Sequence, residues 1–489
     1  MDFPFTPLAP DRSETVATQV ADGVLPQADG WGPYPSLYVA STADALASAP
    51  RGVFSIVLNS GNWQAYEFTA SAIYQLQADW TLVLIDNGYA CPTGFDWSAI
   101  HFGTKLLYTN TVDGLKSYDV EAGGAVSSIS AAGAPAYIFT CANFVVALNC
   151  LDTTGTRNNR LIKTSGFNDQ TNWTGDGADY QELADGEALV AGFDMKQNTA
   201  LLLQTRALVL MTFGNAGGGA QFSLQKVADG KGSVGARSCV AFDGMVFYLA
   251  TDGFYRFDLS NGNVPIGATE IDRTFLASLD QTQFNLVQGA VDPLNKCVLW
   301  RYKRNVDSST TVNEVIIGYE WNLRRWFTLT QQTSYLSRLA TVAVSYNSAT
   351  GTYDSQTLTY DDLFWSGAAP LFGGLDASYK FGVFSGPSLA ATITGNVGNS
   401  PVSGLIRMCT PVTDALNPTI ELGVKDALSS PITFKSPATK GRAGTVSLRG
   451  RGLNVQFRAN IPAGDIGQGP GWSYIMGVDY VKGTGGGSE

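Results

Sequence analysis

A single histidine limits the acid–base chemistry that this chain can carry out. His101 is the one histidine among the 489 residues, so a Ser-His-Asp or Cys-His arrangement would depend on it alone. No G-x-S-x-G nucleophile motif accompanies it. His101 lies beside Phe102 in a segment with strand-like alternation, where a histidine is most often an ordinary packed residue. We therefore expect no catalytic residue and no enzyme activity.

One glycine-rich stretch matches a cofactor-binding pattern. GKGSVG (Gly230 to Gly235) fits G-x-G-x-x-G, but the dinucleotide fingerprint also needs a strand before it and a helix after it. Here RSCVAFDGMVFY follows, which indicates a strand and a turn. We therefore interpret the stretch as a loop and expect no cofactor.

Acidic residues are concentrated in GDGADYQELADGE (Gly175 to Glu187). An EF-hand would place oxygen ligands where Ala178 and Tyr180 stand, so a calcium site is only the alternative to a solvated acidic loop. We predict no metal site. The candidate acidic residues of this loop are Asp176, Asp179, Glu182, Asp185 and Glu187.

TSGFNDQTNW (Thr164 to Trp173) has a faint similarity to the Asp-box turn of sialidase propellers. The glycine of that turn is absent, and the sequence assigns no pair of carboxylates of the kind that glycoside hydrolysis requires. A glycosidase is the main enzyme alternative.

Basic residues are outnumbered, with 31 Lys and Arg against 42 Asp and Glu and a net charge of −11. This balance opposes tight binding of nucleic acid, whose affinity comes mainly from cations on phosphates. Arginines on an acidic chain favour salt bridges between subunits. The candidates are Arg324, Arg325, Arg449, Arg451 and Arg458.

Six widely spaced cysteines form no C-x-x-C pair, which argues against a zinc site. We interpret them as free, mostly buried thiols. The start of the chain lacks the basic and apolar regions of a signal peptide, and no long apolar run suggests membrane insertion. We expect a soluble chain made in the cytoplasm.

Short alternating strands bounded by turn residues recur along the chain. TDGFYRFDLSNGNVPIG (Thr251 to Gly267) shows the pattern, with period-two alternation between an Asp-Gly and an Asn-Gly turn. Similar units begin about every 40 to 50 residues, which is the repeat of four-stranded propeller blades. We predict an all-β fold with a propeller of about six or seven blades. A pair of β-sandwiches is the alternative.

Two helices and four regions complete the prediction. Residues 41–48 and 272–286 have helical patterns, the second with Asp272 at the N-cap. The predicted regions are an N-terminal arm packing on the platform (1–50), the propeller (51–393), a β-sandwich platform (394–482) and a flexible tail (483–489). One of the expected strand pairs combines residues 357–367 with residues 377–386.

Several stretches together resemble the tail hub, or nozzle, proteins of short-tailed bacteriophages. They occur in the expected order over most of the chain up to Trp326. They are VADGVLPQADGWGPYPSL (from Val20), GFNDQTNW (from Gly166), DYQEL (from Asp179), VADGKGSVGARSCVAFDGMVFYLATDGFYRFD (from Val227), PIGATEIDRTF (from Pro265), AVDPLNKCVLWRY (from Ala290) and YEWNLRRW (from Tyr319). The C-terminal hundred or so residues match this family only in general texture.

The resemblance implies a structural virion protein that forms a homo-oligomeric ring of six copies around the DNA exit channel. Its partners would be the adaptor, or head-to-tail connector, above and a needle or fibre protein below, with genomic DNA passing without tight binding. The chain would be made in the host cytoplasm and reside in the virion tail, and the acidic loop at 175–187 would face the channel. The alternative is a glycan-active or receptor-binding propeller at the tail tip.

Overall fold

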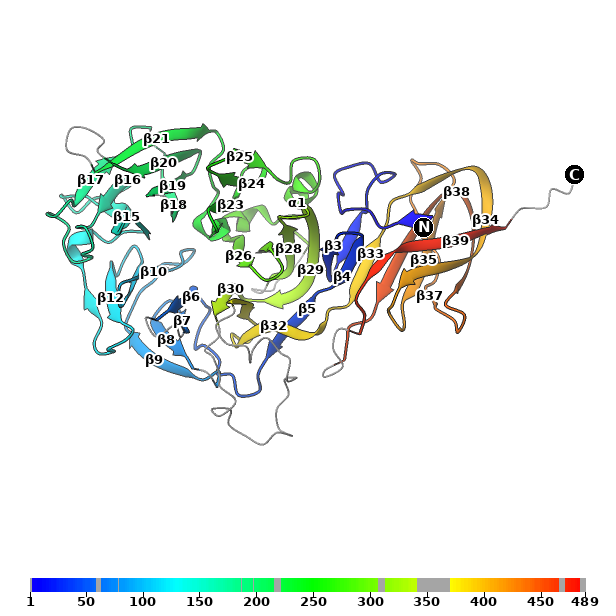
Figure 1. Ribbon diagram of the computed structural model, residues 1–489, viewed down its shortest axis with the longest axis horizontal. Coiled ribbons are helices and arrows are strands. Elements are labelled where there is room, and N and C mark those ends of the chain that lie inside the picture. Colours follow the sequence, from blue (N-terminus) through cyan, green and yellow to red (C-terminus); the bar gives the residue numbers. More distant parts are fainter. Residues whose placement is uncertain are drawn as a thin grey trace, which may run out of the picture.

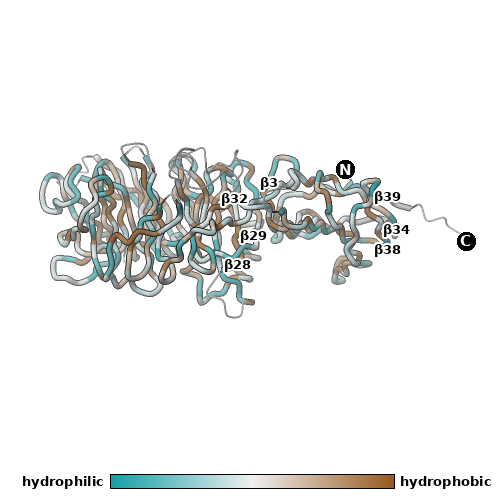
Figure 2. Tube along the Cα trace, turned by 90° about the horizontal axis from the view of Figure 1, so that it is seen from below, coloured by the Kyte–Doolittle hydropathy of each residue, from teal (hydrophilic) through white to brown (hydrophobic). Residues whose placement is uncertain are grey.

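Strands and tight turns organise nearly all of the described chain (Figure 1). The structure is a computed structural model that describes residues 2–58, 63–77, 79–185, 187–196, 198–214, 221–306, 313–340, 370–465 and 471–483. A propeller and a second β unit, the platform, lie end to end in a flat body (Figure 2).

The propeller is built from antiparallel meanders. Five separate four-stranded sheets follow one another in sequence. They are β6 (Gly52–Val57), β7 (Trp63–Phe68), β8 (Ala72–Leu76) and β9 (Leu82–Asn87); β10 (Ser98–Phe102), β11 (Lys105–Thr109), β12 (Lys116–Asp119) and β13 (Ser127–Ser128); β14 (Tyr137–Cys141), β15 (Phe144–Leu151), β16 (Arg157–Thr164) and β17 (Asp179–Glu182); β18 (Leu189–Asp194), β19 (Thr199–Gln204), β20 (Ala207–Phe213) and β21 (Phe222–Asp229); and β22 (Val240–Phe242), β23 (Met245–Ala250), β24 (Gly253–Asp258) and β25 (Gly262–Pro265).

Two further meanders complete the circle. A sixth separate sheet has the order β30 (Tyr335–Ala340), β31 (Pro370–Leu375), β32 (Phe381–Ser388) and β5 (Pro35–Val39). Between it and β22–β25 lies the meander β26 (Gln288–Asp292), β27 (Cys297–Tyr302), β28 (Asn313–Glu320) and β29 (Arg325–Thr333), which continues into a larger sheet. Strand β26 contacts both β22 and β30, and β30 contacts β6, so the meanders close into a ring.

Apolar cores fill the spaces between neighbouring blades. Leu202 and Phe144 pack in the core between the third and fourth meanders, whereas Val53 and Leu339 join the first meander to the last. Each blade therefore buries both faces against its neighbours, which a single meander could not do alone. The predicted all-β propeller is confirmed.

The platform is one large curled sheet that continues from β29. Its C-terminal strands are β33 (Ala391–Thr394), β34 (Gly398–Thr413), β35 (Thr419–Lys425), β36 (Thr433–Phe434), β37 (Ala438–Thr439), β38 (Val446–Ile461) and β39 (Ile475–Gly483). In the first half of β38, residues alternate between buried and exposed, as expected for a sheet with one covered face. The predicted sandwich takes the form of this curled sheet, whose core is continuous with that of the adjoining blades.

The N-terminal arm pairs with both units. Strand β1 (Phe3–Pro4) adds to β39, and β2 (Val20–Asp22) lies between β29 and β33. The hairpin of β3 (Val24–Gln27) and β4 (Gly30–Pro33) extends the sheet from β39. Strand β5 then supplies the outer strand of the last blade. The arm thus packs on the platform and also closes the propeller.

The helix predicted over residues 41–48 does not form. This segment has turns and an isolated bridge between Ala45 and Lys380. The amide of Asp44 donates to the carbonyl of Trp80, and that of Leu46 donates to the carbonyl of Tyr379. Tertiary pairing therefore overrides the weak local helix propensity.

The second predicted helix forms as α1 (Asp272–Ser278), followed by the 3-10 helix η3 (Gln281–Leu286). Ile271 occupies the N-cap, and the carboxylate of Asp272 instead accepts the amide of Phe254 at 3.1 Å. The N-cap assignment of Asp272 was therefore wrong, because this side chain turns inward to β24. The other 3-10 helices are η1 (Ser130–Ala132) and η2 (Ala236–Ser238).

Residues 357–367 and 484–489 lie outside the described residues, so the predicted strand and most of the predicted tail there stay predictions. In the part of the chain that is described, no helix has both the length and the apolarity needed to cross a bilayer.

Candidate functional site

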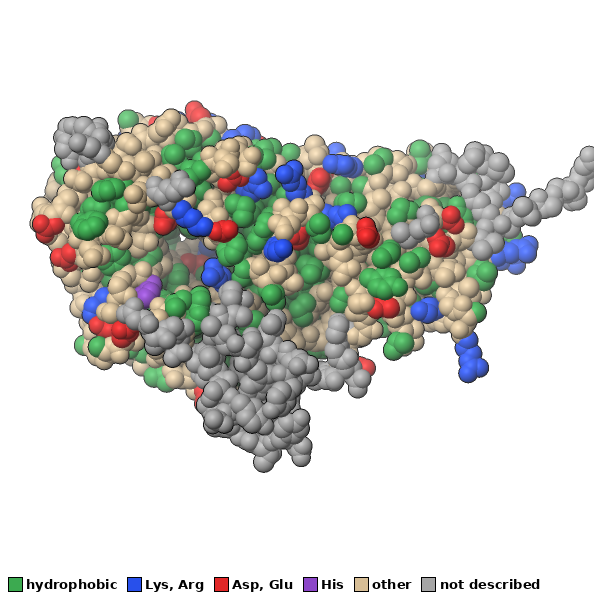
Figure 3. Space-filling view, viewed as in Figure 1, with side chains coloured by type: hydrophobic (Ala, Val, Ile, Leu, Met, Phe, Trp, Pro, Cys, Tyr) green, Lys and Arg blue, Asp and Glu red, His purple; other side chains and the backbone are tan. Residues whose placement is uncertain are grey.

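A cavity of about 600 Å³ lies at the centre of the propeller. Residues of all seven meanders, or of the segments that lead into their innermost strands, contribute to its wall. Figure 3 shows the corresponding hollow, with acidic and basic side chains at its margin. Repeated packing around an axis therefore brings together residues that are far apart in the sequence.

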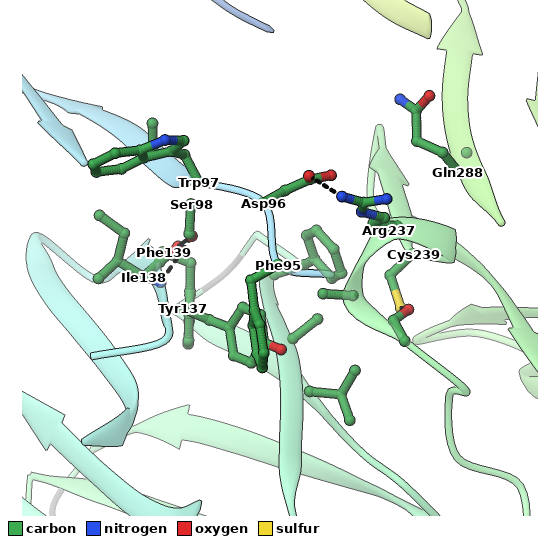
Figure 4. Close-up of a pocket in the computed structure, with 18 of the residues that line it drawn as sticks. Phe95, Asp96, Trp97, Ser98, Tyr137, Ile138, Phe139, Arg237, Cys239 and Gln288 are labelled. Carbon is green, nitrogen blue, oxygen red and sulfur yellow. Dashed lines mark hydrogen bonds and ion pairs between the residues drawn. The ribbon is translucent and has the colours of Figure 1, made fainter. Parts of the chain in front are cut away.

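An ion pair crosses this cavity. Asp96 precedes β10, Arg237 lies in η2 before β22, and the two side chains contact each other directly (Figure 4). Each is only 13% exposed. Burial raises the pKa of Asp96 above its ordinary value, while the guanidinium of Arg237 opposes that shift by stabilising the carboxylate. The pair thus joins two blades that are not adjacent in the ring.

Two more arginines, which do not line the cavity, act electrostatically on this pair. The buried guanidinium of Arg301 donates from Nε to Gln288 Oε1 at 2.9 Å and from Nη1 to the Thr333 carbonyl at 2.7 Å. Burial, together with the like charge of Arg237, lowers the pKa of Arg301 to about 10. Arg51 also acts electrostatically on Asp96. Three guanidinium groups therefore stabilise the charge of Asp96, but of these only Arg237 contacts it and lines the cavity.

Aromatic rings form much of the remaining wall. Phe95, Trp97, Tyr137 and Tyr335 all line the cavity, and the side chain of Phe95 is 41% exposed. Burial raises the pKa of Tyr335 well above its ordinary value, so this hydroxyl stays protonated. The wall therefore combines apolar faces with localised charge.

The thiol that lines the cavity is poorly suited to nucleophilic attack. Cys239 lies 3.0 Å from the Ser233 hydroxyl, and burial raises the pKa of the thiol to about 12. All six cysteines are buried and free, which confirms the sequence prediction.

His101 is not part of the cavity wall. It lies on β10 opposite Leu106, and its Nε2 atom is buried without a hydrogen-bond partner. Burial lowers its pKa, which favours the neutral imidazole. Within the described ranges, no cluster of three or more His, Cys, Asp or Glu side chains could hold a metal ion.

The predicted acidic residues lie around β17, the outermost strand of the third blade and the end of the molecule away from the platform (Figure 1). Each of these side chains bonds to a partner of its own, and the five do not converge on a common site. Asp176 accepts from Asn172, Asp179 from Gln181, Glu182 pairs with Arg160, Asp185 with Gln204 and Lys226, and Glu187 with Thr205. Their position in a channel concerns an assembled ring and stays a prediction.

Two of the predicted interface arginines are engaged within the chain. Arg325 donates to the Gln27 and Ala28 carbonyls. Arg458 pairs with Glu421 at 3.4 Å and lies 3.8 Å above the Phe434 ring.

The other three predicted arginines are exposed. Arg324 lies in the turn between β28 and β29, while Arg449 and Arg451 project from the exposed face of β38.

The two loop motifs have structural roles. GKGSVG connects β21 to η2, and a Cβ on Gly232 would lie 2.2 Å from the Gln204 carbonyl oxygen, so the close backbone approach requires glycine. TSGFNDQTNW spans the end of β16 and the turn after it, where Asp169 accepts the Thr171 amide at 2.8 Å and Trp173 Nε1 donates to the Gln170 carbonyl at 2.9 Å.

Sequence reasoning missed Asp96, Arg237 and Arg301. They belong to three different blades and share no motif. Arg301 did carry a signal, because it interrupts the apolar strand CVLWRY, which is buried throughout.

No family model matches the chain, and no curated protein matches it. Among solved structures, a streptogramin B lyase is 12% identical with a TM-score of 0.42, covering 71% of this chain and 97% of that one. BamB from Moraxella catarrhalis is 10% identical with a TM-score of 0.38, covering 76% and 96%. Virginiamycin B lyase from Staphylococcus aureus is 12% identical with a TM-score of 0.39, covering 71% and 96%. At this similarity, the fold assignment rests on the strand pairing of the chain itself.

Proposed function

We propose that this chain is a structural subunit of a phage tail hub or nozzle, assembled as a ring around the DNA exit channel. The proposal rests on the ordered sequence stretches that resemble this family and on the path of the N-terminal arm. A force-bearing subunit needs its two units held as one body, and the arm supplies that connection.

The arm provides a connection in two directions. Phe3 pairs with Val478 on β39, whereas Leu37 pairs with Phe384 in the last blade. Between these points, Trp31 is fully buried in a core that also contains Trp326 of β29 and Ile475 of β39. Separating propeller from platform would therefore break backbone pairing and expose a shared core.

The exposed charges are compatible with subunits that contact one another through individual basic residues. Arg324, Arg449 and Arg451 are exposed, while the net charge of −11 disfavours tight retention of passing DNA. In the proposed ring these arginines lie at subunit contacts, and the predicted acidic residues around β17 face the channel.

Mass photometry and negative-stain imaging of the purified chain, alone and with its adaptor, test the proposal. We expect rings with about six times the 52.0 kDa mass of one chain. Arg449→Glu should weaken the ring, whereas Arg206→Glu, at an exposed turn of the propeller, should not. A chain that stays monomeric with the adaptor present and is absent from virions would refute the proposal.

A further inference from the structure

A buried lysine lies opposite a buried asparagine on two neighbouring strands of the platform. Lys425 ends β35, and its backbone partner on the antiparallel strand β38 is Asn454 (Figure 1). Directly opposed residues of antiparallel strands project from the same face of a sheet, with Cβ atoms about 5 Å apart. The side chain of Lys425 is 2% exposed, and Asn454 as a whole is 4% exposed. An amine and a carboxamide therefore lie within reach of each other and largely out of water.

The turn after β35 bonds to both side chains. Lys425 Nζ donates to the carbonyl of Leu428 at 2.8 Å, and Asn454 Nδ2 donates to the carbonyl of Asp426 at 3.3 Å. Asn454 Oδ1 is buried and accepts no hydrogen bond in the described part of the chain. A buried amide oxygen without a donor is unfavourable. Because only one side of this amide is bonded, the side chain can turn to present Cγ to Nζ.

A carboxylate of the N-terminal arm contacts the amine. Glu14 accepts a hydrogen bond from Lys425 Nζ and forms an ion pair with it. The ammonium form of lysine has no lone pair with which to attack a carbonyl carbon, so a base in contact with Nζ is needed to take its proton. Glu14 and Lys425 also line an open pocket of about 530 Å³. This pocket gives a leaving ammonia molecule a path to solvent.

We propose that Lys425 and Asn454 form an intramolecular isopeptide bond, with Glu14 as the catalytic residue that transfers protons. Glu14 first takes one proton from the ammonium group, and the neutral Nζ attacks Cγ of Asn454. Glu14 delivers that proton to Nδ2 and takes a second one from Nζ, so that the Cγ–Nδ2 bond breaks and the Nζ–Cγ amide remains. The released ammonia takes the second proton and leaves as ammonium, which restores the Glu14 carboxylate. No atom changes oxidation state, so no oxidant or reductant is consumed.

The reaction removes an unfavourable buried charge. A buried ammonium group is costly even when it is paired, whereas the amide that replaces it is neutral. Strand β38 pairs with β33 and β34 as well as with β35, so the bond fixes β35 to the middle of the platform sheet. The bond forms within one chain, so it does not depend on the ring assembly of the proposed function.

Mass spectrometry of the full chain tests for the bond. We expect the denatured wild-type protein to be lighter than its sequence by one ammonia molecule. Digestion with trypsin should release residues 408–435 joined to residues 452–458, because an acylated Lys425 is no longer a cleavage site. Recovery of Lys425 and Asn454 only in separate, linear peptides would overturn the proposal.

Four variants assign the reaction to these side chains. Lys425→Arg keeps the positive charge without the amine, and Asn454→Ala lacks the carboxamide, so both should have the full sequence mass. Glu14→Gln lacks the base and should be mostly linear when freshly purified, since loss of a general base slows such a step by about 10²- to 10⁴-fold. Lys440→Arg is the matched control, because Lys440 is a platform lysine that donates to the Ala415 carbonyl at 3.0 Å, and it should keep the cross-link.

The wild-type measurement needs no variant to fold, so the test stays decisive where a substitution destabilises the platform. A cross-link to residues 452–458 that persists in Lys425→Arg would place the bond at another side chain and overturn the assignment. Complete cross-linking of Glu14→Gln would overturn the role of Glu14 as the base.

Discussion

Glu67 is a buried carboxyl group for which the fold provides no partner. It lies on β7 between Val53 and Tyr74 of the neighbouring strands, and its side chain is 1% exposed. Neither carboxyl oxygen has a hydrogen-bond partner in the described part of the chain. Strand alternation places it on the same face as Ala65, which packs in the core between the first and last blades. Glu67 therefore lies where the propeller closes.

Burial raises the pKa of Glu67 from 4.5 to about 8. The folded protein then binds this proton more tightly than the unfolded chain, so stability from this group is fully present below pH 4.5 and falls as the pH rises to about 8. Each unit of pKa difference corresponds to about 1.4 kcal/mol. Ionisation of Glu67 therefore lowers the free energy of unfolding by about 3 kcal/mol at pH 7 and about 4 kcal/mol at pH 8.

Glu67→Gln keeps the shape of the side chain and removes the ionisation. We expect the variant and the wild type to have similar stability near pH 5, and the variant to be more stable by about 4 kcal/mol near pH 8. Unfolding entropy of about 2 cal/mol/K per residue converts this difference to a rise of about 4 °C in the thermal midpoint. Tryptophan fluorescence during heating at both pH values measures it.

Glu320→Gln is the matched control. Glu320 is 5% exposed, but its carboxylate accepts the amides of Asn322 and Leu323, so the substitution should destabilise the fold. A Glu67→Gln variant whose stability gain is the same near pH 5 and near pH 8, or which is destabilised near pH 8, would refute the reasoning about an uncompensated buried charge.

Three further outcomes follow from the packing. Gly253→Ala should lower the free energy of unfolding, measured by chemical denaturation, by about 3 kcal/mol, because φ is +143° and the new Cβ would lie 2.1 Å from Asp272 Oδ2. The control Gly262→Ala, at φ +68° with open space around it, should lower it by about 1 kcal/mol. Trp31→Ala should lower the free energy of unfolding by about 4 kcal/mol. It should also reduce hydrogen-exchange protection in β29 and β39 together, because Trp31 and both strands contribute to one core. A loss of protection confined to β39 would contradict this coupling. The six buried thiols should resist a thiol reagent in the native protein and react on unfolding; rapid labelling of the native protein would show that the described burial is incomplete.

The sequence predicted the blades because their signals are local. Asp-Gly and Asn-Gly turns at Asp252 and Asn261 bound β24 within a few residues, so alternation and turn chemistry agree. The helix at 41–48 failed for the opposite reason, since its amides pair with Trp80 and Tyr379, whose positions no local pattern specifies. The sequence did not predict the cavity either, since residues that form its wall, such as Asp96 and Arg237, are 141 residues apart.

The path of the arm explains why the two units could not be fully separated by sequence alone. Strand β29 pairs with β28 as part of a blade and with β2 as the start of the platform sheet. A single backbone pair, Asp22 with Thr328, marks that transition, and the Asp22 carboxylate also accepts the hydroxyls of Thr328 and Thr330. The boundary is therefore a continuous hydrogen-bonded sheet rather than a linker. In a subunit proposed to surround a moving DNA, such a junction transmits load through backbone hydrogen bonds and a shared core, which resist separation better than a flexible connection would.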